Sequence, residues 1–208
     1  IGITGCMGQV ARKDASTCEL NFLDPIESVR EAVAELKARE NPDLIVCISH
    51  AGTGSKLGET EDEILAQSVP DIDVIISGHS HTVLPDYIKY GDTYIVSCGE
   101  YGLYTGEVQL KKNDSGRWDL GKYELHLMDE SIAEDEEVLA QLETIDNAIN
   151  EKVLNSYGLK AQDVICINNT AFETVKDVGE YHTEMKLGNL LADSYRSSAN
   201  NTPSASEH

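Results

Sequence analysis

Basic side chains are scarce in this 208-residue chain, in which 16 lysines and arginines stand against 37 aspartates and glutamates. The resulting formal net charge of −21 repels phosphate backbones and anionic lipid headgroups. Nucleic acid polymers and membrane surfaces are therefore not expected as partners. The acidity suits a protein that handles divalent cations, although solubility alone explains it equally well.

Cysteine pairs and long apolar runs are also missing. The five cysteines include no C-x-x-C pair, which argues against zinc knuckles and dithiol redox sites and leaves the redox compartment open. No apolar run approaches the roughly 18 residues needed to cross a bilayer, so we expect no transmembrane segment. The opening residues IGITGCMG lack the charged leader and apolar stretch of a signal peptide, and they predict a strand.

Three common motifs for phosphate binding or ester hydrolysis are absent. The segment AGTGSKLG, residues 51–58, has neither the G-K-[ST] order of a P-loop nor the G-x-G-x-x-G spacing of a dinucleotide site. No serine lies in a G-x-S-x-G elbow, so a serine hydrolase is not expected. We interpret residues 51–58 as a loop that follows a histidine.

The first half of the chain alternates helix caps with short apolar runs. Asp24 and Pro25 predict the start of an amphipathic helix over residues 24–39. The runs LIVCIS (44–49) and DVIIS (73–77) predict strands that are buried on both faces.

A second helix is expected between these two strands. Thr60 and Glu63 have the spacing of a capping box, which predicts a helix over residues 59–69. The order strand, helix, strand, helix, strand is typical of a parallel α/β sheet. Farther on, short runs bounded by turn residues predict antiparallel strands over residues 93–99, 105–112 and 120–128. We therefore predict one unit of mixed α/β and α+β character over residues 1–128.

The rest of the chain predicts a linker helix and the beginning of a second domain. Apolar residues recur at helical spacing from about Asp135 to Tyr157, and Gly158 is a typical helix stop. This pattern places a linker helix within residues 129–160. Residues 161–208 predict a short strand (DVICIN), a helix (TEMKLGNLLADSYR) and a tail too polar to pack.

Three histidines follow the predicted strands. His50 comes directly after residues 44–49, and His79 and His81 come after residues 73–77. Because the carboxyl ends of parallel strands share one sheet edge, these imidazoles are expected to converge there. On an extended chain, His79 and His81 would project to the same side, roughly 6.6 Å apart at Cα. Three neutral imidazoles could hold one zinc ion, whereas a second metal would need carboxylates from elsewhere.

Single histidines are more often ordinary core or surface residues than ligands. We adopt this interpretation for His126, His182 and His208. A His-x-His pair after one strand, with a third histidine after the neighbouring strand, favours a metal site instead. A metal-binding or scaffold protein without catalysis remains an open alternative.

With these histidines, the chain resembles the bacterial 5′-nucleotidase and UDP-sugar hydrolase family, in which a calcineurin-like metallophosphoesterase domain precedes a 5′-nucleotidase C-terminal domain. ISHAG resembles the family's histidine after a strand, VPDIDVIISGHSHTVLP its Gly-His-Ser-His or Gly-His-Ser-Gln/Asn segment, and GEYGLYTGEVQL its following Gly-rich strand pair. EMKLGNLLAD resembles the opening helix of the C-terminal domain. The resemblance implies that residues 1–128 form the C-terminal half of the metallophosphoesterase β-sandwich, and that residues 161–208 begin the α/β C-terminal domain.

The resemblance also implies a dinuclear metal centre. His50 and His79 would hold one divalent ion, zinc, manganese or similar, and His81 would help to hold the other. The family's remaining ligands and its catalytic Asn-His motif would precede residue 1, as in an internal fragment. The resemblance therefore places no catalytic residue in the chain and leaves the substrate-binding residues unknown. It also predicts that the 208-residue chain alone is inactive.

For the whole protein, the implied reaction is hydrolysis of a nucleotide phosphomonoester by a water activated between two metals. A 2′,3′-cyclic-nucleotide phosphodiesterase with 3′-nucleotidase activity and a UDP-sugar hydrolase remain open alternatives. The implied partner is a nucleotide or a nucleotide sugar. The family also implies an extracytoplasmic location, which means periplasmic, cell-wall bound or secreted.

Overall fold

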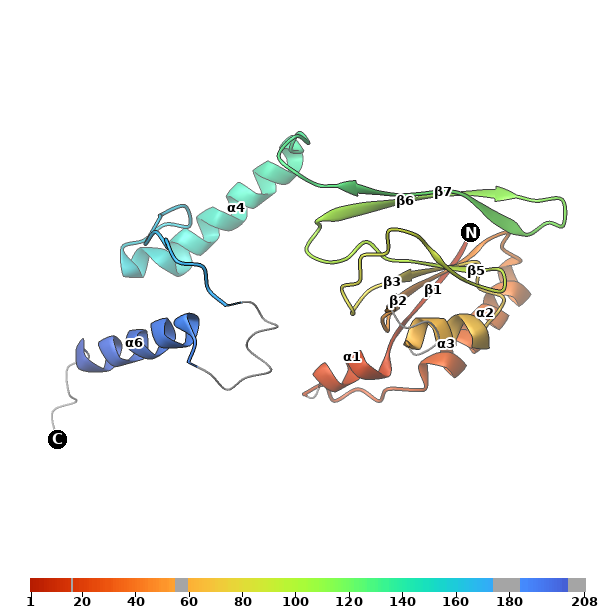
Figure 1. The fold of residues 1–208 in the computed structure, drawn as a ribbon, viewed down its shortest axis with the longest axis horizontal. Helices are drawn as coiled ribbons and strands as arrows, with labels where there is room; N and C mark the ends of the chain where they lie inside the picture. The colour runs from red at the N-terminus through yellow and green to blue at the C-terminus, as the bar shows by residue number, and fades with distance from the viewer. Residues whose placement is uncertain (16, 55–59, 174–183, 202–208) are drawn as a thin grey trace. The chain divides into compact units, whose positions relative to one another are not determined.

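The computed structural model describes residues 1–15, 17–54, 60–173 and 184–201 (Figure 1). The chain divides into two compact units, Ile1–Ala133 and Glu134–His208. The first unit contains the sheet, its covering helices and a two-stranded ribbon. The three histidines expected at the metal site all lie in this first unit.

The central sheet of the first unit has five strands in the order β1-β2-β3-β5-β4. These strands are β1 (Gly2–Met7), β2 (Ile45–His50), β3 (Val74–Ser77), β4 (Ile88–Tyr90) and β5 (Thr93–Val96). Neighbouring pairs among β1, β2, β3 and β5 are parallel, and β4 pairs antiparallel with β5. The predicted mixed fold with a parallel sheet is therefore confirmed. Residues 93–99 were expected to form an antiparallel strand. Their strand, β5, pairs antiparallel with β4 but parallel with β3.

Three helices accompany this sheet: α1 (Gln9–Asp14), α2 (Pro25–Glu40) and α3 (Glu61–Ser68). The Asp24 carboxylate accepts hydrogen bonds from the amides of Ile26 and Glu27, both at 3.0 Å, and so caps α2 as expected. The short α1 has no counterpart among the sequence predictions. Its six residues are too few for helical periodicity to be recognised.

The capping box predicted for α3 is wrong. The Thr60 side chain makes no capping hydrogen bond, and its buried hydroxyl finds no partner among the described residues. The Glu63 carboxylate accepts instead from the Thr53 hydroxyl, at 2.7 Å. The Glu63 carboxylate, which the local pattern assigned to the helix cap, therefore bonds to Thr53 of another segment instead.

Helices α2 and α3 cover one face of the sheet, as Figure 1 shows. The core between them and the strands is apolar and contains Val29, Val33, Ile45, Cys47, Leu65, Ala66, Val69, Ile72, Ile75 and Ile95. On the opposite face, Ile3 is 61% exposed, Ile48 55% and Ile76 46%. Burial of β2 and β3 on both faces was therefore a wrong expectation, because the described helices pack on one face only.

The opposite face is partly covered by a two-stranded antiparallel ribbon of β6 (Tyr104–Lys112) and β7 (Trp118–Leu127). This pairing confirms the antiparallel strands predicted for residues 105–112 and 120–128. A cavity of about 250 Å³ lies between the ribbon and the sheet. Its apolar lining includes Val46, Val74, Ile76, Val96, Val108 and Leu110.

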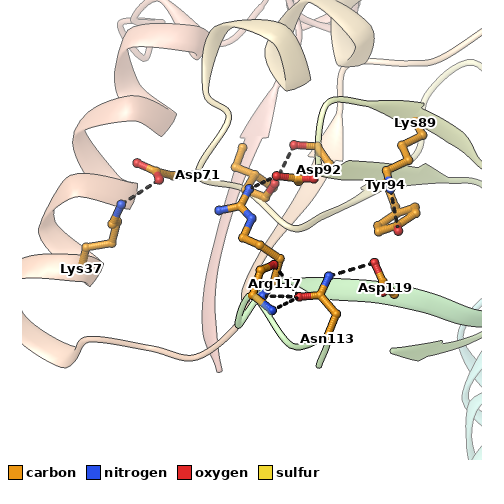
Figure 2. Close-up of polar contacts among 11 residues, drawn as sticks. Lys37, Asp71, Lys89, Asp92, Tyr94, Asn113, Arg117 and Asp119 are labelled. Carbon is orange, nitrogen blue, oxygen red and sulfur yellow. Dashed lines mark hydrogen bonds and ion pairs between the residues drawn. The ribbon is translucent and has the colours of Figure 1, made fainter. Parts of the chain in front are cut away.

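Polar contacts tie the turn of this ribbon to the sheet (Figure 2). Nη2 of Arg117 lies 2.9 Å from Oδ2 of Asp92, and the amide of Leu120 donates to the Tyr94 hydroxyl at 3.2 Å. Within the turn, the Asn113 side-chain oxygen accepts from the amide of Arg117 at 3.0 Å. The ribbon is thus anchored at its turn end by side chains of β5 and of the turn before it.

The second unit contains α4 (Glu136–Lys152), the 3₁₀ helix η1 (Leu154–Tyr157) and α6 (Lys186–Asn201). Asp135 caps α4 through the amides of the first turn, and Gly158 ends η1 with φ of 69°. The single helix expected from about Asp135 to Tyr157 is therefore divided: α4 ends at Lys152, and Gly158 stops only the short η1. None of the helices that the structure describes combines the length and apolar character needed to cross a bilayer.

The strand predicted for residues 163–168 is wrong. This segment has no regular structure, and Val164, Ile165 and Ile167 are exposed. A strand needs a partner to satisfy its backbone, and the described part of the second unit contains no strand. The predicted C-terminal helix is present as α6, although it continues into the segment expected to be an unpacked tail.

Candidate metal centre

His50 occupies the carboxyl end of β2. In the register of the sheet, His50 pairs with Met7 of β1, and the preceding Ser49 pairs with Ser77 of β3. The alternation along β2 puts His50 on the face that carries the exposed Ile48 and not on the face packed by helices. Its imidazole is therefore available to a ligand at the sheet edge.

His79 and His81 lie in a tight turn just beyond β3. Their φ angles of 72° and 54° are left-handed, and the Ser80 amide donates to the Gly78 carbonyl at 2.9 Å. The extended chain assumed for this His-x-His pair is therefore wrong. Left-handed backbone is costly for residues with a Cβ, so the surrounding contacts must hold this turn in place.

The turn brings His79 against His50. Their ring centroids are 5.0 Å apart, with an interplanar angle of 63°. Gly78 permits this approach, since a Cβ atom there would lie 3.3 Å from Nδ1 of His50. The backbone is held as well, because the Gly78 amide donates to the Ser49 carbonyl at 2.8 Å. Two of the three sequence-predicted imidazoles are thus neighbours at the carboxyl edge of the sheet.

His81 makes different contacts. Its Nδ1 contacts the Glu100 carboxylate, and its ring lies 5.8 Å from the Tyr101 ring, centroid to centroid. Within the described residues, the donor atoms of His50, His79 and His81 do not all lie within 4.8 Å of one another. Glu100 was missed in the sequence because it follows β5, far along the chain from the histidines. The adjacent left-handed Gly99 and Gly102 are the signal that could have marked this loop.

Ser80 joins the two histidine-bearing loops. Its hydroxyl donates to the Thr53 carbonyl at 2.6 Å and accepts from the Thr53 amide at 3.1 Å. The Thr82 hydroxyl donates to the same Thr53 carbonyl, also at 2.6 Å. The loop after β2 and the turn after β3 are therefore held together by side-chain bonds to the backbone.

Asp62, on the first turn of α3, lies beneath the same two strand ends. It is fully buried, and its two oxygens accept from the hydroxyls of Ser49 and Ser77, each at 2.5 Å. Burial raises the pKa of Asp62 above its ordinary value, and the two serine hydrogen bonds oppose this rise. Sequence reasoning missed Asp62 because it appeared to be one of several acids in the first turn of a surface helix.

A different group of possible ligands lies on the ribbon. Oxygens of Glu107 and Glu124 and a ring nitrogen of His126 lie within 4.8 Å of one another, the one such group of three in the described part of the chain. The Lys122 ammonium, however, lies 2.8 Å from Glu107 and 2.6 Å from Glu124. This cation already occupies both acids and offsets one of their two negative charges, so we keep the interpretation of His126 as a surface residue. His182 and His208 lie outside the described residues.

The residues at the sheet edge fit a divalent metal ion in part. His50 and His79 offer two imidazoles side by side, the ligand type preferred by zinc and similar ions. Among the described residues, no Asp or Glu forms with His50 and His79 a group whose three donor atoms all lie within 4.8 Å of one another. The chain's own contribution is therefore a pair of nitrogen ligands, and the ligand roles of His50, His79 and His81 stay predictions.

Known proteins resemble the chain in sequence, although no protein-family model matches it. An uncharacterized metallophosphoesterase of Bacillus subtilis is 31% identical over 141 residues, which cover 67% of this chain and 29% of that protein. A 5′-nucleotidase of Vibrio cholerae is 26% identical over 205 residues, which cover 83% of this chain and 37% of the relative.

The fold has counterparts among solved structures. A 5′-nucleotidase precursor from Thermus thermophilus aligns with a TM-score of 0.60 at 27% identity, covering 86% of this chain and 36% of that one. A second nucleotidase structure, from Staphylococcus aureus, supports the fold alone, with a TM-score of 0.53 at 20% identity. The chain thus spans about a third of the length of the proteins it matches.

Proposed function

Because the chain belongs to the 5′-nucleotidase family of metallophosphoesterases, we propose that the whole protein hydrolyses phosphomonoesters of nucleotides with divalent metal ions. The relatives are hydrolases by name, and this chain corresponds to about a third of their length. The class of substrate, the metals and the reaction are therefore proposals for the whole protein. We propose an extracytoplasmic location on the same grounds.

One observation supports this proposal above the others. His50 and His79 come from different strands, and their rings meet 5.0 Å apart at the carboxyl edge of a parallel sheet. Ligand sites of open α/β sheets lie at this edge. Gly78 leaves room beside His50, since a Cβ atom there would lie 3.3 Å from its Nδ1. A purely structural histidine would not require this combination of strand end, left-handed turn and glycine.

The proposed roles of the chain's own residues follow from these contacts. His50 and His79 hold a divalent ion through neutral ring nitrogens, and His81 contributes to a second ion, oriented by Glu100. When bound, such ions supply a water nucleophile at neutral pH and neutralise charge on the phosphoryl group. The Ser80 and Thr53 hydrogen bonds keep both histidine-bearing loops at a constant separation. No general acid is assigned to the described residues.

Substitution of His79 tests the proposal in the whole protein. His79→Ala is expected to lower the turnover of AMP by several orders of magnitude, because an ion that activates water loses a ligand. Phosphate release is measured with zinc and with manganese, after the metal content of each protein has been matched. AMP, a 2′,3′-cyclic nucleotide and a UDP-sugar are assayed side by side to identify the substrate.

His126→Ala is the matched control, because it removes an imidazole on the ribbon that pairs with Glu107 and lies outside the proposed centre. This variant should keep the activity of the unmodified protein. Turnover by His79→Ala equal to that of His126→Ala would remove His79 from the mechanism. Absence of metal-dependent hydrolysis of all three substrates would refute the proposed function itself.

A further inference from the structure

A buried carboxylate connects the two strands that carry the histidines. Asp62 has no exposed surface, and each of its oxygens accepts a 2.5 Å hydrogen bond from a serine hydroxyl. The two donors, Ser49 and Ser77, are partners in the β2–β3 register. One side chain of α3 therefore crosslinks both strands at the same level of the sheet.

The two serines stand immediately before the candidate ligands. Ser49 is the residue before His50, and Ser77 is separated from His79 only by Gly78. Along a strand, neighbouring side chains point to opposite faces, so Ser49 faces the helices while His50 faces the other side. Asp62 thus holds the backbone from which both imidazoles extend, without contacting either ring.

Asp62 and Ser49 also bond to the loop that follows His50. The Asp62 amide donates to the Gly52 carbonyl at 3.1 Å, and the Ala51 amide donates to the Ser49 hydroxyl at 3.2 Å. The hydroxyl of Ser49 therefore accepts from one backbone group while it donates to Asp62. Asp62 is therefore bonded to residues on both sides of His50: to the Ser49 hydroxyl before it and to the Gly52 carbonyl after it.

Stability alone gives a poor reason for an acid at this position. Burying a carboxylate is costly, and the raised pKa of Asp62 has desolvation as its largest cause. Asp62 belongs to a small group of buried polar side chains that also contains Ser49, Ser77 and Glu63. Replacing buried polar groups with packed apolar ones is often neutral or stabilising. A requirement for accurate backbone placement explains the acid better.

We propose that Asp62 is a positioning residue, which sets the separation and orientation of His50 and His79 for metal binding by holding Ser49 and Ser77. This inference rests on the proposed function only in taking the two histidines as metal ligands. Residues that orient metal ligands typically change metal affinity by about 10- to 100-fold when they are replaced. Asp62 would act one step farther back, through the backbone of each ligand.

Zinc affinity of the 208-residue chain tests the proposal without any assay of hydrolysis. Asp62→Ala removes both acceptors and is expected to weaken zinc binding about 10-fold, measured by equilibrium dialysis. It should also shift the imidazole ¹H–¹⁵N resonances of His50 and His79 in the metal-free chain. Asp62→Asn keeps one acceptor oxygen and can donate to the other serine, so it should restore part of the affinity.

Asp73→Ala is the matched control, because Asp73 serves the opposite ends of the same two strands. Its carboxylate accepts from the Ile45 amide at 2.8 Å, and desolvation raises its pKa as well. Loss of Asp73 should lower the thermal midpoint without moving the resonances of His50 and His79. Zinc affinities are compared at temperatures where every variant is folded to the same extent.

The outcomes separate the two proposals. Unchanged zinc affinity and unchanged imidazole resonances in folded Asp62→Ala would overturn the positioning role, whatever the whole protein does to AMP. If Asp62→Ala does not fold, Ser49→Ala and Ser77→Ala each remove one of its two bonds and should each weaken zinc binding. Wild-type zinc binding in both serine variants would equally overturn it. A whole protein inactive on nucleotides, with Asp62-dependent zinc affinity, would refute the proposed function alone.

Discussion

At the scale of single residues, three non-glycine residues with left-handed backbone gather around the candidate centre. They are His79, His81 and Tyr101, with φ of 72°, 54° and 55°. Each such conformation costs about 1–2 kcal/mol for a residue with a side chain. Strain of this kind persists where surrounding contacts hold it, and it is common at functional sites. Here the Ser80–Thr53 hydrogen bonds and the contact of His81 with the Glu100 carboxylate provide that support.

Glu107 on the ribbon carries a residue-scale prediction about pH. The Lys122 ammonium, followed by Gln109 and His126, lowers the pKa of Glu107 from 4.5 to about 2. A carboxyl whose pKa is lower in the folded state stabilises the fold above its unfolded pKa. That stabilisation is lost as the pH falls from about 4.5 through about 2. Lys122→Met should return the pKa of Glu107 toward 4.5 in an NMR titration.

Lys111→Met is the control for this titration. It removes the same charge from the same strand pair, and no bond from Lys111 to Glu107 is described. The pKa of Glu107 should then stay low. A low pKa of Glu107 in Lys122→Met would contradict the assignment of Lys122 as the main cause.

At the scale of elements, the helices of the first unit combine local signals with tertiary roles. α2 is begun by Asp24 and buries Val29 and Val33 against the sheet. α3 buries Leu65 and Ala66 in the same core, but its first turn also buries two acids. α2 thus behaves as an ordinary covering helix, whereas α3 reaches the strand ends that carry the histidines.

Removal of the α2 cap carries the element-scale prediction. Asp24→Ala leaves the amides of Ile26 and Glu27 without their acceptor and should lower the free energy of unfolding of the first unit by about 1 kcal/mol. Chemical denaturation followed by circular dichroism measures this change.

Asp135→Ala makes the matched change at α4, where the capping geometry is the same but no helix residue is buried. This variant should leave the unfolding of the first unit unchanged. Equal loss of stability in both variants would show that the two caps support one cooperative structure.

At the scale of the whole molecule, the sheet is covered on one face by helices and only partly on the other. Ile3, Ile48 and Ile76 remain about half exposed or more, beside a ribbon that encloses a cavity of about 250 Å³. An apolar surface of this kind is uncommon on an isolated soluble domain. The chain also spans only about a third of the relatives it matches. We therefore make a separate prediction for metal binding and hydrolysis by the 208-residue chain alone.

The 208-residue chain should bind no more than one zinc ion, weakly, and should release no phosphate from AMP. The described residues bring two imidazoles together, but no carboxylate completes a group of three donor atoms within 4.8 Å of one another with them. Two adjacent cations without a bridging anion repel each other strongly. Equilibrium dialysis with zinc and manganese, followed by an AMP assay on the same sample, measures both properties. Two tightly bound ions with metal-dependent phosphate release would contradict this expectation.

Local patterns were sufficient for much of the fold. The Asp24 cap and the parallel order of the first strands follow from the capping residues and apolar runs of the sequence. The sequence also placed His50 and His79 at one sheet edge, because parallel strands end together. In these cases backbone geometry and periodicity leave few alternatives.

Tertiary structure alone decided the remaining features, since each depends on partners distant in the chain. The left-handed turn at His79 and His81 is stabilised by the hydrogen bond from Ser80 to Thr53. The Glu63 carboxylate bonds to the Thr53 hydroxyl and not to the expected cap of α3. Asp62 has the local sequence of a surface acid and acquires its role only when β2 and β3 bring Ser49 and Ser77 beside it. The apolar run at 163–168 has strand character but forms none, because a strand requires a partner that local sequence cannot supply.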